Sequence, residues 1–327
     1  MRWGPVLGAT LLGACGEASP AHVDGGLPTD VSAPDVTATD TPAAQADTGE
    51  LSPDVPFACV RAPREKAWDG RCNGRAALCG RAFDAVSYVT THNAMSAAEH
   101  RYIAPNQTHG IARQLRDGVR GLMLDLHDDR GVVSLCHGVC SLGRMPLEEG
   151  LCAVGQHLDA EPGSVVTLIL ESYVSAAALQ PAFRAAGLLD DAHVQPAGAP
   201  WPTLGEMVRA GRRLVVLTDR DGGRRPWLHD VWDYAQETPF SATEPPQLSC
   251  APNRGRSANT LFIFNHFLTQ LSGFPHLARQ VNFNPFLLER ARACAASRGR
   301  LPNFVTVDFY EIGDVAATVE ALNGFAD

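Results

Sequence analysis

Seven short apolar runs in this chain end in residues that can exchange protons or bind ions. His92 and His137 end two of these runs, and Asp308 lies near the end of the last one. Two imidazoles can act as base and acid in one reaction because both change charge near neutral pH. A carboxylate that hydrogen bonds to the base would orient its ring and stabilise its imidazolium. These residue types therefore predict acid–base chemistry such as phosphodiester cleavage.

The elements that position these residues follow from the pattern between them. The apolar runs are residues 86–92, 121–127, 132–137, 165–172, 213–219, 260–266 and 304–310. Amphipathic stretches are residues 111–118, 146–160, 177–189, 203–211, 284–299 and 314–324. Several runs are apolar throughout, which is typical of parallel strands buried on both faces. The alternation predicts an α/β fold, an imperfect TIM-type (β/α)8 barrel, with a doubly wound open sheet as the alternative.

In such a barrel the carboxyl ends of the strands meet at one mouth, where the active site lies. Further polar residues end the runs and would share this mouth: Asn93, Asp125, His127, Glu171, Asp219, Asn265 and His266. The last strand of a closed barrel pairs with the first, so Asp308 should lie beside His92. Taken singly, such residues also have structural uses, because Asp219 fits a turn and Tyr310 fits core packing.

Composition narrows the class of protein. The chain has 327 residues with a net charge of −9 and 45% hydrophobic residues, which suits a globular domain with a large core. The acidic balance gives no basic footprint for nucleic acid, so no nucleic-acid partner is expected. Lys66 is the only lysine and stands in a polar run, which disfavours Schiff-base chemistry.

The amino terminus predicts export. Residues 1–15 carry a short apolar stretch, too short to span a bilayer, that ends in Leu-Gly-Ala-Cys. This ending resembles a bacterial lipobox, which implies a lipid anchor on Cys15 and a cell-envelope location; an ordinary secretory signal is the alternative. Residues 16–56 are rich in Ala, Pro, Asp and Thr and predict a disordered tether. Residues 57–327 should form the barrel.

Cysteine usage agrees with export. Beyond Cys15 an even number remains, which predicts disulfides: Cys59, Cys72, Cys79, Cys136, Cys140, Cys152, Cys250 and Cys294. No CxxC…CxxC spacing favours structural zinc. Spacing does not fix the pairing; Cys72–Cys79 and Cys250–Cys294 are the expected pairs, and Cys136 and Cys140 should brace the loop of His137 by disulfide bonding.

A set of motifs resembles the X domain of phosphatidylinositol-specific phospholipases C. The motifs are TTHNAMS (90–96), PNQTHGIARQLRDGVRGLMLDLH (105–127), LCHG (135–138) and LILES (168–172). Their order is specific as a set, although each piece alone is weak. The resemblance covers roughly residues 70–320 and is closest to single-domain members of plants, fungi and bacteria, whose opening segment CNGRAALCGRAF (72–83) fits.

The resemblance implies roles for particular residues. His92 matches the general base and His137 the general acid that cleave the glycerol–phosphate bond of a phosphatidylinositol-like lipid through a cyclic phosphodiester. We expect Asp308 to orient His92. The phosphate and headgroup are expected to contact His127, Asn265 and Tyr310.

The resemblance also raises the question of a metal. In metal-dependent members Ca²⁺ is bound at positions that match Asn93, Asp125 and Glu171 here, but Met123 stands where a further carboxylate would be expected. In metal-independent members an arginine replaces the cation, and His127 occupies that position. Because Ca²⁺ takes six to eight oxygen ligands, the residue types leave Ca²⁺ dependence open.

Two other functions compete with a phospholipase C-like phosphodiesterase. A glycerophosphodiester phosphodiesterase shares the barrel, yet would want the carboxylate that Met123 replaces. A non-catalytic lipid- or glycan-binding surface lipoprotein would not need a histidine pair. The expected partners are a phospholipid-type substrate and a membrane reached through the anchor, with the protein a monomer. Asn106 begins a glycosylation sequon, which the lipobox resemblance discounts.

Overall fold

The computed structural model describes residues 58–63, 66–270 and 273–325, which fall within one compact unit. The predicted signal peptide with Cys15 and the predicted tether lie outside the described residues. Within the described part of the chain, no helix is long and apolar enough to cross a membrane.

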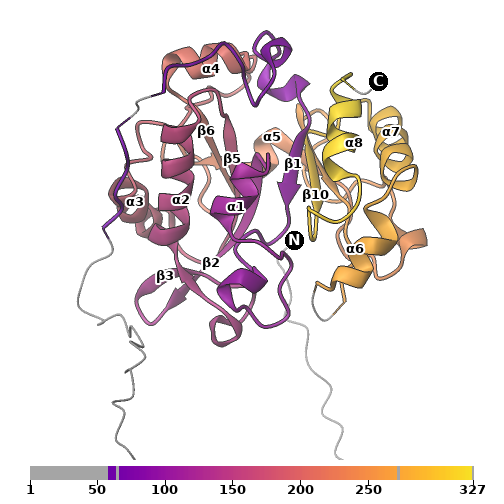
Figure 1. Ribbon diagram of the computed structural model, residues 1–327, viewed down its shortest axis with the longest axis horizontal. Coiled ribbons are helices and arrows are strands. Elements are labelled where there is room, and N and C mark those ends of the chain that lie inside the picture. Colours follow the sequence, from indigo (N-terminus) through magenta and orange to yellow (C-terminus); the bar gives the residue numbers. More distant parts are fainter. Residues whose placement is uncertain (1–57, 64–65, 271–272, 326–327) are drawn as a thin grey trace, which may run out of the picture. The chain divides into compact units, whose positions relative to one another are not determined.

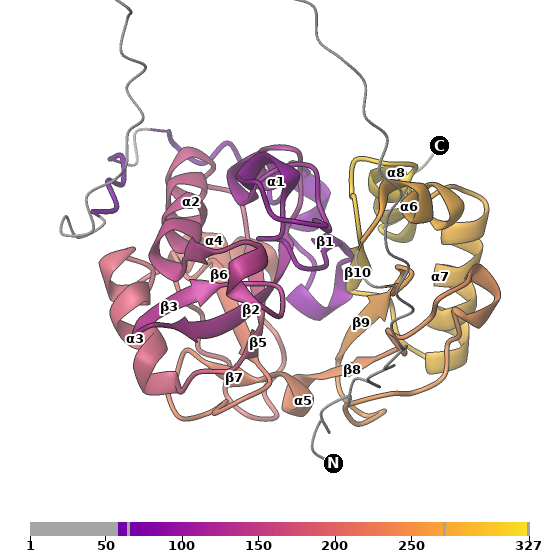
Figure 2. The same cartoon turned by 90° about the horizontal axis from the view of Figure 1, so that it is seen from below.

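A curled parallel sheet forms the centre of the fold (Figures 1 and 2). Its strands follow the order β7-β6-β5-β2-β1-β10-β9-β8, and every neighbouring pair in this order is parallel. The strands are β1 (Tyr88–Thr91), β2 (Gly121–Asp129), β5 (Val166–Ser172), β6 (Leu214–Thr218), β7 (His229–Asp230), β8 (Ala235–Glu237), β9 (Leu261–Asn265) and β10 (Phe304–Val307). In the described residues β7 and β8 do not pair with each other; α5 (Val231–Tyr234) connects them (Figure 2). The predicted imperfect TIM-type barrel is confirmed, with its incomplete closure at this point.

Helices cover the outside of the sheet (Figure 2). They are α1 (Ile111–Arg116), α2 (Leu147–Ala160), α3 (Ala176–Ala185), α4 (Leu204–Ala210), α6 (Pro275–Val281), α7 (Phe286–Arg298) and α8 (Val315–Leu322). Each amphipathic stretch of the sequence forms one of them, whereas α5 and α6 were not predicted. The helix α4 begins with a capping box between Thr203 and Glu206, which satisfies two backbone donors at once.

The strands are buried on both faces, as their continuous apolar runs predict. In β5, Leu168 and Leu170 belong to the core under the helices, whereas Ile169 belongs to the core inside the barrel. Successive side chains of a strand point to opposite faces, so one apolar run supplies both cores.

The expectation that the run 132–137 is a barrel strand is wrong. β3 (Val132–Leu135) pairs antiparallel with β2, and β4 (Met145–Pro146) pairs antiparallel with β3. Arg130 and Gly131 both have positive φ, 58° and 87°, and make the tight reversal that such a hairpin needs. We call residues 130–146 the flap, because this segment leaves β2 and returns to α2 without joining the barrel.

Four disulfides join all eight cysteines of the described residues. They are Cys59–Cys152, Cys72–Cys79, Cys136–Cys140 and Cys250–Cys294. Both expected pairs are confirmed, and Cys136 and Cys140 brace the loop of His137 by bonding to each other.

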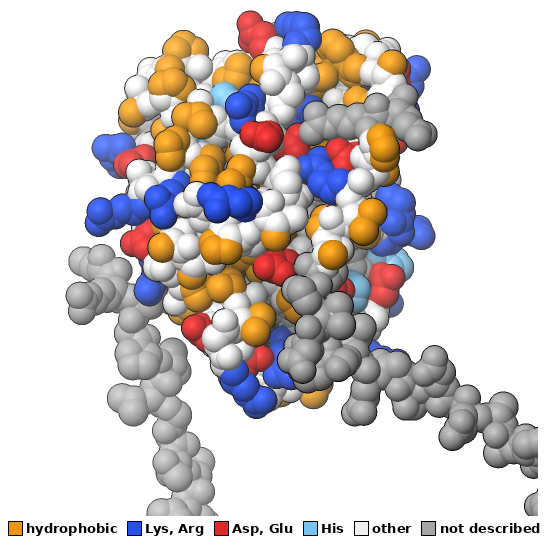
Figure 3. Space-filling view, turned by 90° about the vertical axis from the view of Figure 1, so that its left-hand side faces the viewer, with side chains coloured by type: hydrophobic (Ala, Val, Ile, Leu, Met, Phe, Trp, Pro, Cys, Tyr) orange, Lys and Arg blue, Asp and Glu red, His pale blue; other side chains and the backbone are white. Residues whose placement is uncertain are grey.

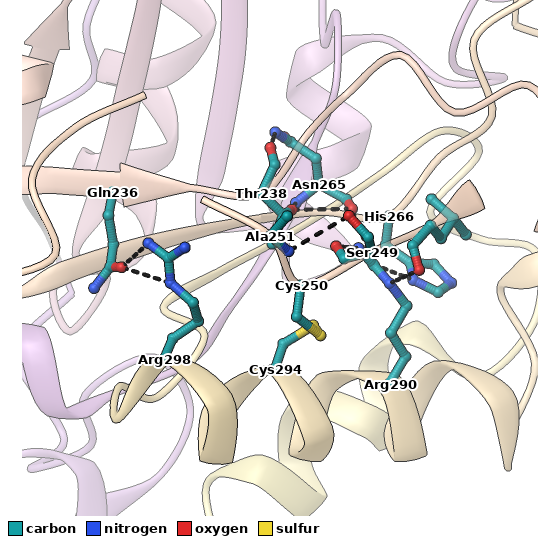
Figure 4. Close-up of a disulfide and its surroundings, with 11 residues drawn as sticks. Gln236, Thr238, Ser249, Cys250, Ala251, Asn265, His266, Arg290, Cys294 and Arg298 are labelled. Carbon is teal, nitrogen blue, oxygen red and sulfur yellow. Dashed lines mark hydrogen bonds between the residues drawn. A yellow bond between two sulfur atoms is a disulfide. The ribbon is translucent and has the colours of Figure 1, made fainter. Parts of the chain in front are cut away.

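Hydrogen bonds and a disulfide join one face of α7 to the barrel (Figure 4). Arg290 donates to the carbonyls of Leu248, Ser249 and Asn265 and contacts Nδ1 of His266 at 2.9 Å. One turn later Cys294 bonds to Cys250, and one turn after that Arg298 donates to Oε1 of Gln236. Residues four apart lie on one helix face, so these three side chains reach β8, β9 and their connection together.

Candidate active site

The adjacent strands β1 and β10 bring His92 and Asp308 together. Thr91 and Val307 are partners in the register of this pair, and the backbone N–H of His92 donates to Val307 at 3.0 Å. The residues that follow these two partners are His92 and Asp308. Nδ1 of His92 lies 2.9 Å from Oδ1 of Asp308, which confirms the predicted contact. The ring of Phe267 stacks on the imidazole with centroids 3.8 Å apart, and so fixes its plane.

Two amides that the sequence analysis did not assign support this pair. Nδ2 of Asn106 donates to Oδ1 of Asp308 at 3.2 Å. Nε2 of Gln107 donates to the carbonyls of His92 and Val307 at 2.8 and 3.1 Å. Both amides belong to the motif PNQT, and their polar side chains were the feature of the sequence that could have suggested a role in the site. Asn106 is only 2% exposed, so this structure gives a physical reason to discount its sequon.

The flap, rather than a barrel strand, delivers His137. The N–H of Cys136 donates to the carbonyl of Asp125 at 3.2 Å, which ties the flap to β2 immediately before His137. Gly138 has a φ of 70°, which allows the chain to turn directly after the histidine. The Cys136–Cys140 disulfide then closes the turn.

Asn93 joins the two histidines to β2. When Nε2 of His92 and Nε2 of His137 both carry a proton, the Asn93 amide oxygen accepts a hydrogen bond from each at 3.2 Å. The amide nitrogen then donates to the two carboxylate oxygens of Asp125 at 3.2 and 3.3 Å. Asn93 has a φ of 46°, a left-handed conformation that asparagine tolerates better than most residues. Both imidazoles therefore face one point in the barrel mouth.

Burial and neighbouring charges shift the protonation of this site. Burial first, and then the charge of His92, lower the pKa of His137 below its ordinary value. Burial, followed by the charges of Glu171 and Asp219, holds the pKa of Asp125 well above its usual range. Asp125 and Glu171 are direct partners in the β2–β5 register, which explains their mutual repulsion.

The three candidate calcium ligands lie around the carboxylate of Asp125. With its oxygen toward the protonated histidines, Asn93 directs its amide nitrogen toward Asp125, whereas the reversed amide presents its oxygen there. Glu171 accepts a hydrogen bond from the hydroxyl of Tyr173. In the described residues, no group of three or more His, Cys, Asp and Glu side chains could hold a metal ion. Three side-chain ligands are fewer than the six to eight oxygens that Ca²⁺ takes, so substrate and water oxygens would have to complete its coordination.

The three predicted substrate contacts are placed differently from one another. His127 stacks on Tyr173 with centroids 4.4 Å apart, and its Nε2 is buried without a partner in the described part of the chain. Asn265 donates to the carbonyl of Thr238 at 2.7 Å, and the hydroxyl of Tyr310 donates to Asp117 at 2.7 Å. Asn265 and Tyr310 are thus occupied by structural contacts, and His127 has a free nitrogen.

A buried ion pair at the end of β8 has no counterpart in the sequence analysis. Arg254 makes a two-pronged contact with Glu237, which is 1% exposed, and the guanidinium lies over the ring of Trp232 at 4.2 Å. The charge of Arg254 also acts to lower the pKa of Asp219, although burial raises that pKa overall. This pair therefore adds a cation to the electrostatics of the carboxylates in the barrel mouth.

Comparison with known proteins gives the family. The chain belongs to the PI-PLC X domain family: residues 78–323 match the model of that family, described as PI-PLC X 1. A PI-PLC X domain-containing protein 1 of Arthroderma benhamiae is 31% identical over 290 residues, covering 79% of this chain and 91% of the relative. An uncharacterized secreted protein of the same fungus and the Arabidopsis thaliana PI-PLC X domain-containing protein At5g67130 are 30% and 31% identical. The matches cover 76% and 75% of this chain and 62% of the length of each of those two relatives.

Solved structures support the fold. The phosphatidylinositol-specific phospholipase C of Listeria monocytogenes aligns with a TM-score of 0.53 at 16% identity, covering 76% of this chain and 96% of that enzyme. A Staphylococcus aureus phosphatidylinositol-specific phospholipase C aligns with a TM-score of 0.54 at 12% identity, covering 74% and 94%. The chain therefore has the barrel fold of these enzymes.

Proposed function

We propose that this protein is a phospholipase C-like phosphodiesterase that cleaves phosphatidylinositol-like lipids with His92 and His137. One observation carries the proposal: both Nε2 atoms lie 3.2 Å from the same end of the Asn93 amide, and Asp308 holds the far side of His92. A binding protein would not need two imidazoles that converge on one point with a carboxylate behind one of them.

His92 is the base in this proposal. Its Nδ1–H donates to Asp308, which leaves Nε2 to accept the proton of the headgroup 2-hydroxyl. The resulting oxygen attacks phosphorus and forms a cyclic phosphodiester. Asp308 then accepts a hydrogen bond from Nδ1–H of the new imidazolium and stabilises its charge, and the Asn93 amide can turn its oxygen toward the new Nε2–H.

His137 is the acid. The bond between phosphorus and the glycerol oxygen breaks, and the protonated imidazole of His137 gives its proton to that oxygen, releasing diacylglycerol. The lowered pKa of His137 makes its imidazolium a stronger acid. His127, with its unpartnered Nε2, is the side chain we expect to contact the phosphate. Asn93, Asp125 and Glu171 would hold Ca²⁺ if the ion binds, and it would add positive charge beside the phosphate; no step here passes through a metal.

Export fits the same proposal. Four disulfides are typical of a chain that folds in an oxidising compartment, and one relative is named as a secreted protein. The fungal and plant origin of the relatives does not support a bacterial lipid anchor at Cys15, so that anchor remains a prediction from the sequence alone.

The test is phosphorus NMR of the full chain with phosphatidylinositol in mixed micelles. We expect a cyclic inositol phosphate signal that disappears in His92→Ala and in His137→Ala. His276→Ala, a histidine of α6, serves as the matched control and should retain the signal.

Two other results would redirect the assignment. Turnover of glycerophosphodiesters without turnover of phosphatidylinositol would favour the glycerophosphodiester phosphodiesterase. Binding of phosphatidylinositol vesicles by a chain that turns over neither substrate would contradict an enzymatic role and favour a lipid-binding barrel.

A further inference from the structure

A second polar cavity lies away from the histidines, between α1 and α2. Its volume is about 640 Å³, and it is lined by Ala112, Arg116, Arg120, Ala153, Gln156, His157, Ala160 and Glu161. Arg120 directly precedes β2, whereas Asp125 lies at the catalytic mouth of the same strand. At about 3.3 Å per residue this cavity is about 16 Å from the mouth along β2. The three alanines explain why the two helices leave space here.

Arg116 and Arg120 bring two positive charges to this cavity, and Glu161 offsets part of the charge of Arg120. Within the described residues, neither forms an ion pair with a carboxylate. Glu161 is the acidic residue of the lining, but its carboxylate already pairs with Nζ of Lys66 at 2.9 Å. The cavity therefore has a net positive lining.

The guanidinium of Arg120 has donors to spare. Nε donates to Oδ1 of Asn73 at 3.2 Å, and Nη1 donates to the carbonyls of Leu115 and Val119 at 2.8 Å each. These contacts fix the plane of the group. Nη2 makes no hydrogen bond in the described part of the chain, and Arg120 also lines a second cavity of about 260 Å³ next to Glu161. A guanidinium fixed on one edge and open on the other suits the planar recognition of an oxyanion.

His157 lies within the electrostatic field of the same two arginines. Burial and the charges of Arg120, Arg213 and Arg116 lower its pKa to about 3. Its Nε2 contacts Oγ of Ser164 at 3.1 Å. An anion placed between the arginines would oppose these charges and raise the pKa of this ring.

We infer that the cavity between α1 and α2 is a binding site for a phosphate-type oxyanion, free or carried as a monoester on a small polar ligand, with Arg116 and Arg120 as its donors. The volume exceeds that of one phosphate group and falls in the range of pockets that hold small ligands. Figure 3 looks onto the side of the molecule that carries α2 and α3, where Lys and Arg side chains lie among apolar ones.

The experiment follows the His157 ring by NMR in the full chain, with the signal assigned by its loss in His157→Gln. Inorganic phosphate and glycerol 3-phosphate are titrated separately against sodium chloride of equal ionic strength. We expect a saturable shift of the His157 signal with phosphate and none with chloride. Tighter binding of glycerol 3-phosphate than of phosphate would support a monoester ligand, and equal binding would support the free anion.

Variants make the site falsifiable. Arg116→Gln, at an exposed position of α1, should weaken the binding by about tenfold or more, as expected for a lost charged hydrogen bond. Arg120→Met should abolish it, and Arg116→Gln still decides the matter where Arg120→Met does not fold. Arg130→Gln on the flap, 85% exposed, is the matched control and should bind as the parent does. Unchanged binding in Arg116→Gln, or phosphate-induced shifts confined to His92 and His137, would overturn the inference.

Discussion

The two halves of this barrel are stabilised in different ways. In the half formed by β1, β2, β5 and β6, apolar strand residues pack against apolar residues of α1, α2 and α3. In the half formed by β8 and β9, α7 also packs apolar residues into this core, and one face of the helix adds Arg290, Cys294 and Arg298. The longest strands belong to the first half, where β2 has nine residues and β5 seven, whereas β9 has five and β8 three.

This difference shows what each kind of contact requires of a sequence. Apolar packing is non-directional and needs only a periodic supply of hydrophobic residues. The contacts of α7 need particular side chains opposite particular carbonyls, and only the folded chain defines those positions. His92 and Asp308 lie between the two halves, on β1 and β10, so the proposed base depends on both.

The largest effect is expected at this junction. Asp308→Asn should lower kcat by about 10²–10⁴-fold, since an amide cannot hold the ring of His92 in the required tautomer. The unfolding midpoint should change little, because the substitution conserves shape. Steady-state turnover of phosphatidylinositol measures the first and thermal unfolding the second. Glu311→Gln, at an exposed neighbouring position, should leave kcat unchanged, and a loss under tenfold in Asp308→Asn would argue against the pair.

Removing the Cys250–Cys294 disulfide should test how much α7 stabilises the half of the barrel formed by β8 and β9. This bond closes 44 residues, so the double alanine variant should lose about 3–4 kcal/mol of unfolding free energy. The Cys72–Cys79 bond closes only seven residues, and its removal should cost about 2 kcal/mol. Urea unfolding of both variants makes the comparison. Equal losses would mean that the covalent link of α7 is no more important than a local one.

Arg290 and Leu151 provide a paired test of the two halves. Arg290→Met leaves buried carbonyls without a donor and should cost about 2–3 kcal/mol, whereas Arg292→Met on the exposed side of α7 should stay within about 0.5 kcal/mol. Leu151→Ala in α2 should cost about 2–5 kcal/mol. Amide exchange should then accelerate in β8 and β9 for the first variant and in β2 and β5 for the last. Uniform acceleration in both would contradict the division.

Stability should fall as the pH falls, with a contribution from each half. His157 and His266 have pKa values lowered to about 3, chiefly by burial and arginine charges. Both are neutral in the folded chain, while the unfolded chain takes up protons below about 6.5, so the contribution is complete above 6.5 and declines toward 3. Between pH 7 and pH 5 each histidine should cost about 2 kcal/mol. Urea unfolding at the two pH values should show a smaller difference in His266→Gln than in the parent, and an identical difference would refute the role of His266.

The smallest effect is expected from removing calcium. Turnover should stay within about twofold when a chelator is added or Ca²⁺ is supplied, because Met123 replaces one expected carboxylate and the Asn93 amide turns its oxygen toward the protonated histidines. Turnover that requires Ca²⁺ would mean that this amide reverses when the ion binds.

Much of the fold could be predicted from the sequence, and the exceptions share a cause. Each long strand coincided with an apolar run, while β7 and β8 were missed because two or three residues leave no period to detect. The run 132–137 was detected as a strand but assigned to the barrel, because an apolar run does not specify whether its partner is parallel. The tight turn at Arg130 and Gly131 makes β3 antiparallel to β2.

Some features of the candidate site could likewise be predicted from the sequence, and others could not. The contact of His92 with Asp308 followed from the closure of a barrel, which places the last strand beside the first. The stacking of Phe267 and the bridging position of Asn93 depend on side-chain directions that no spacing reveals. Asn265 was predicted to lie at the barrel mouth because it ends β9, yet its amide donates to the carbonyl of Thr238.

The flap has a consequence for how this site can change. His92 is built into the frame of the barrel, but His137 stands on an insert that leaves β2, pairs with it through β3 and returns to α2. An insert of this kind can be lengthened, shortened or exchanged while the frame keeps its shape. The proposed acid, His137, can therefore be exchanged together with its flap while the proposed base, His92, stays unchanged. Flaps transplanted from relatives offer a route to enzymes that accept new leaving groups.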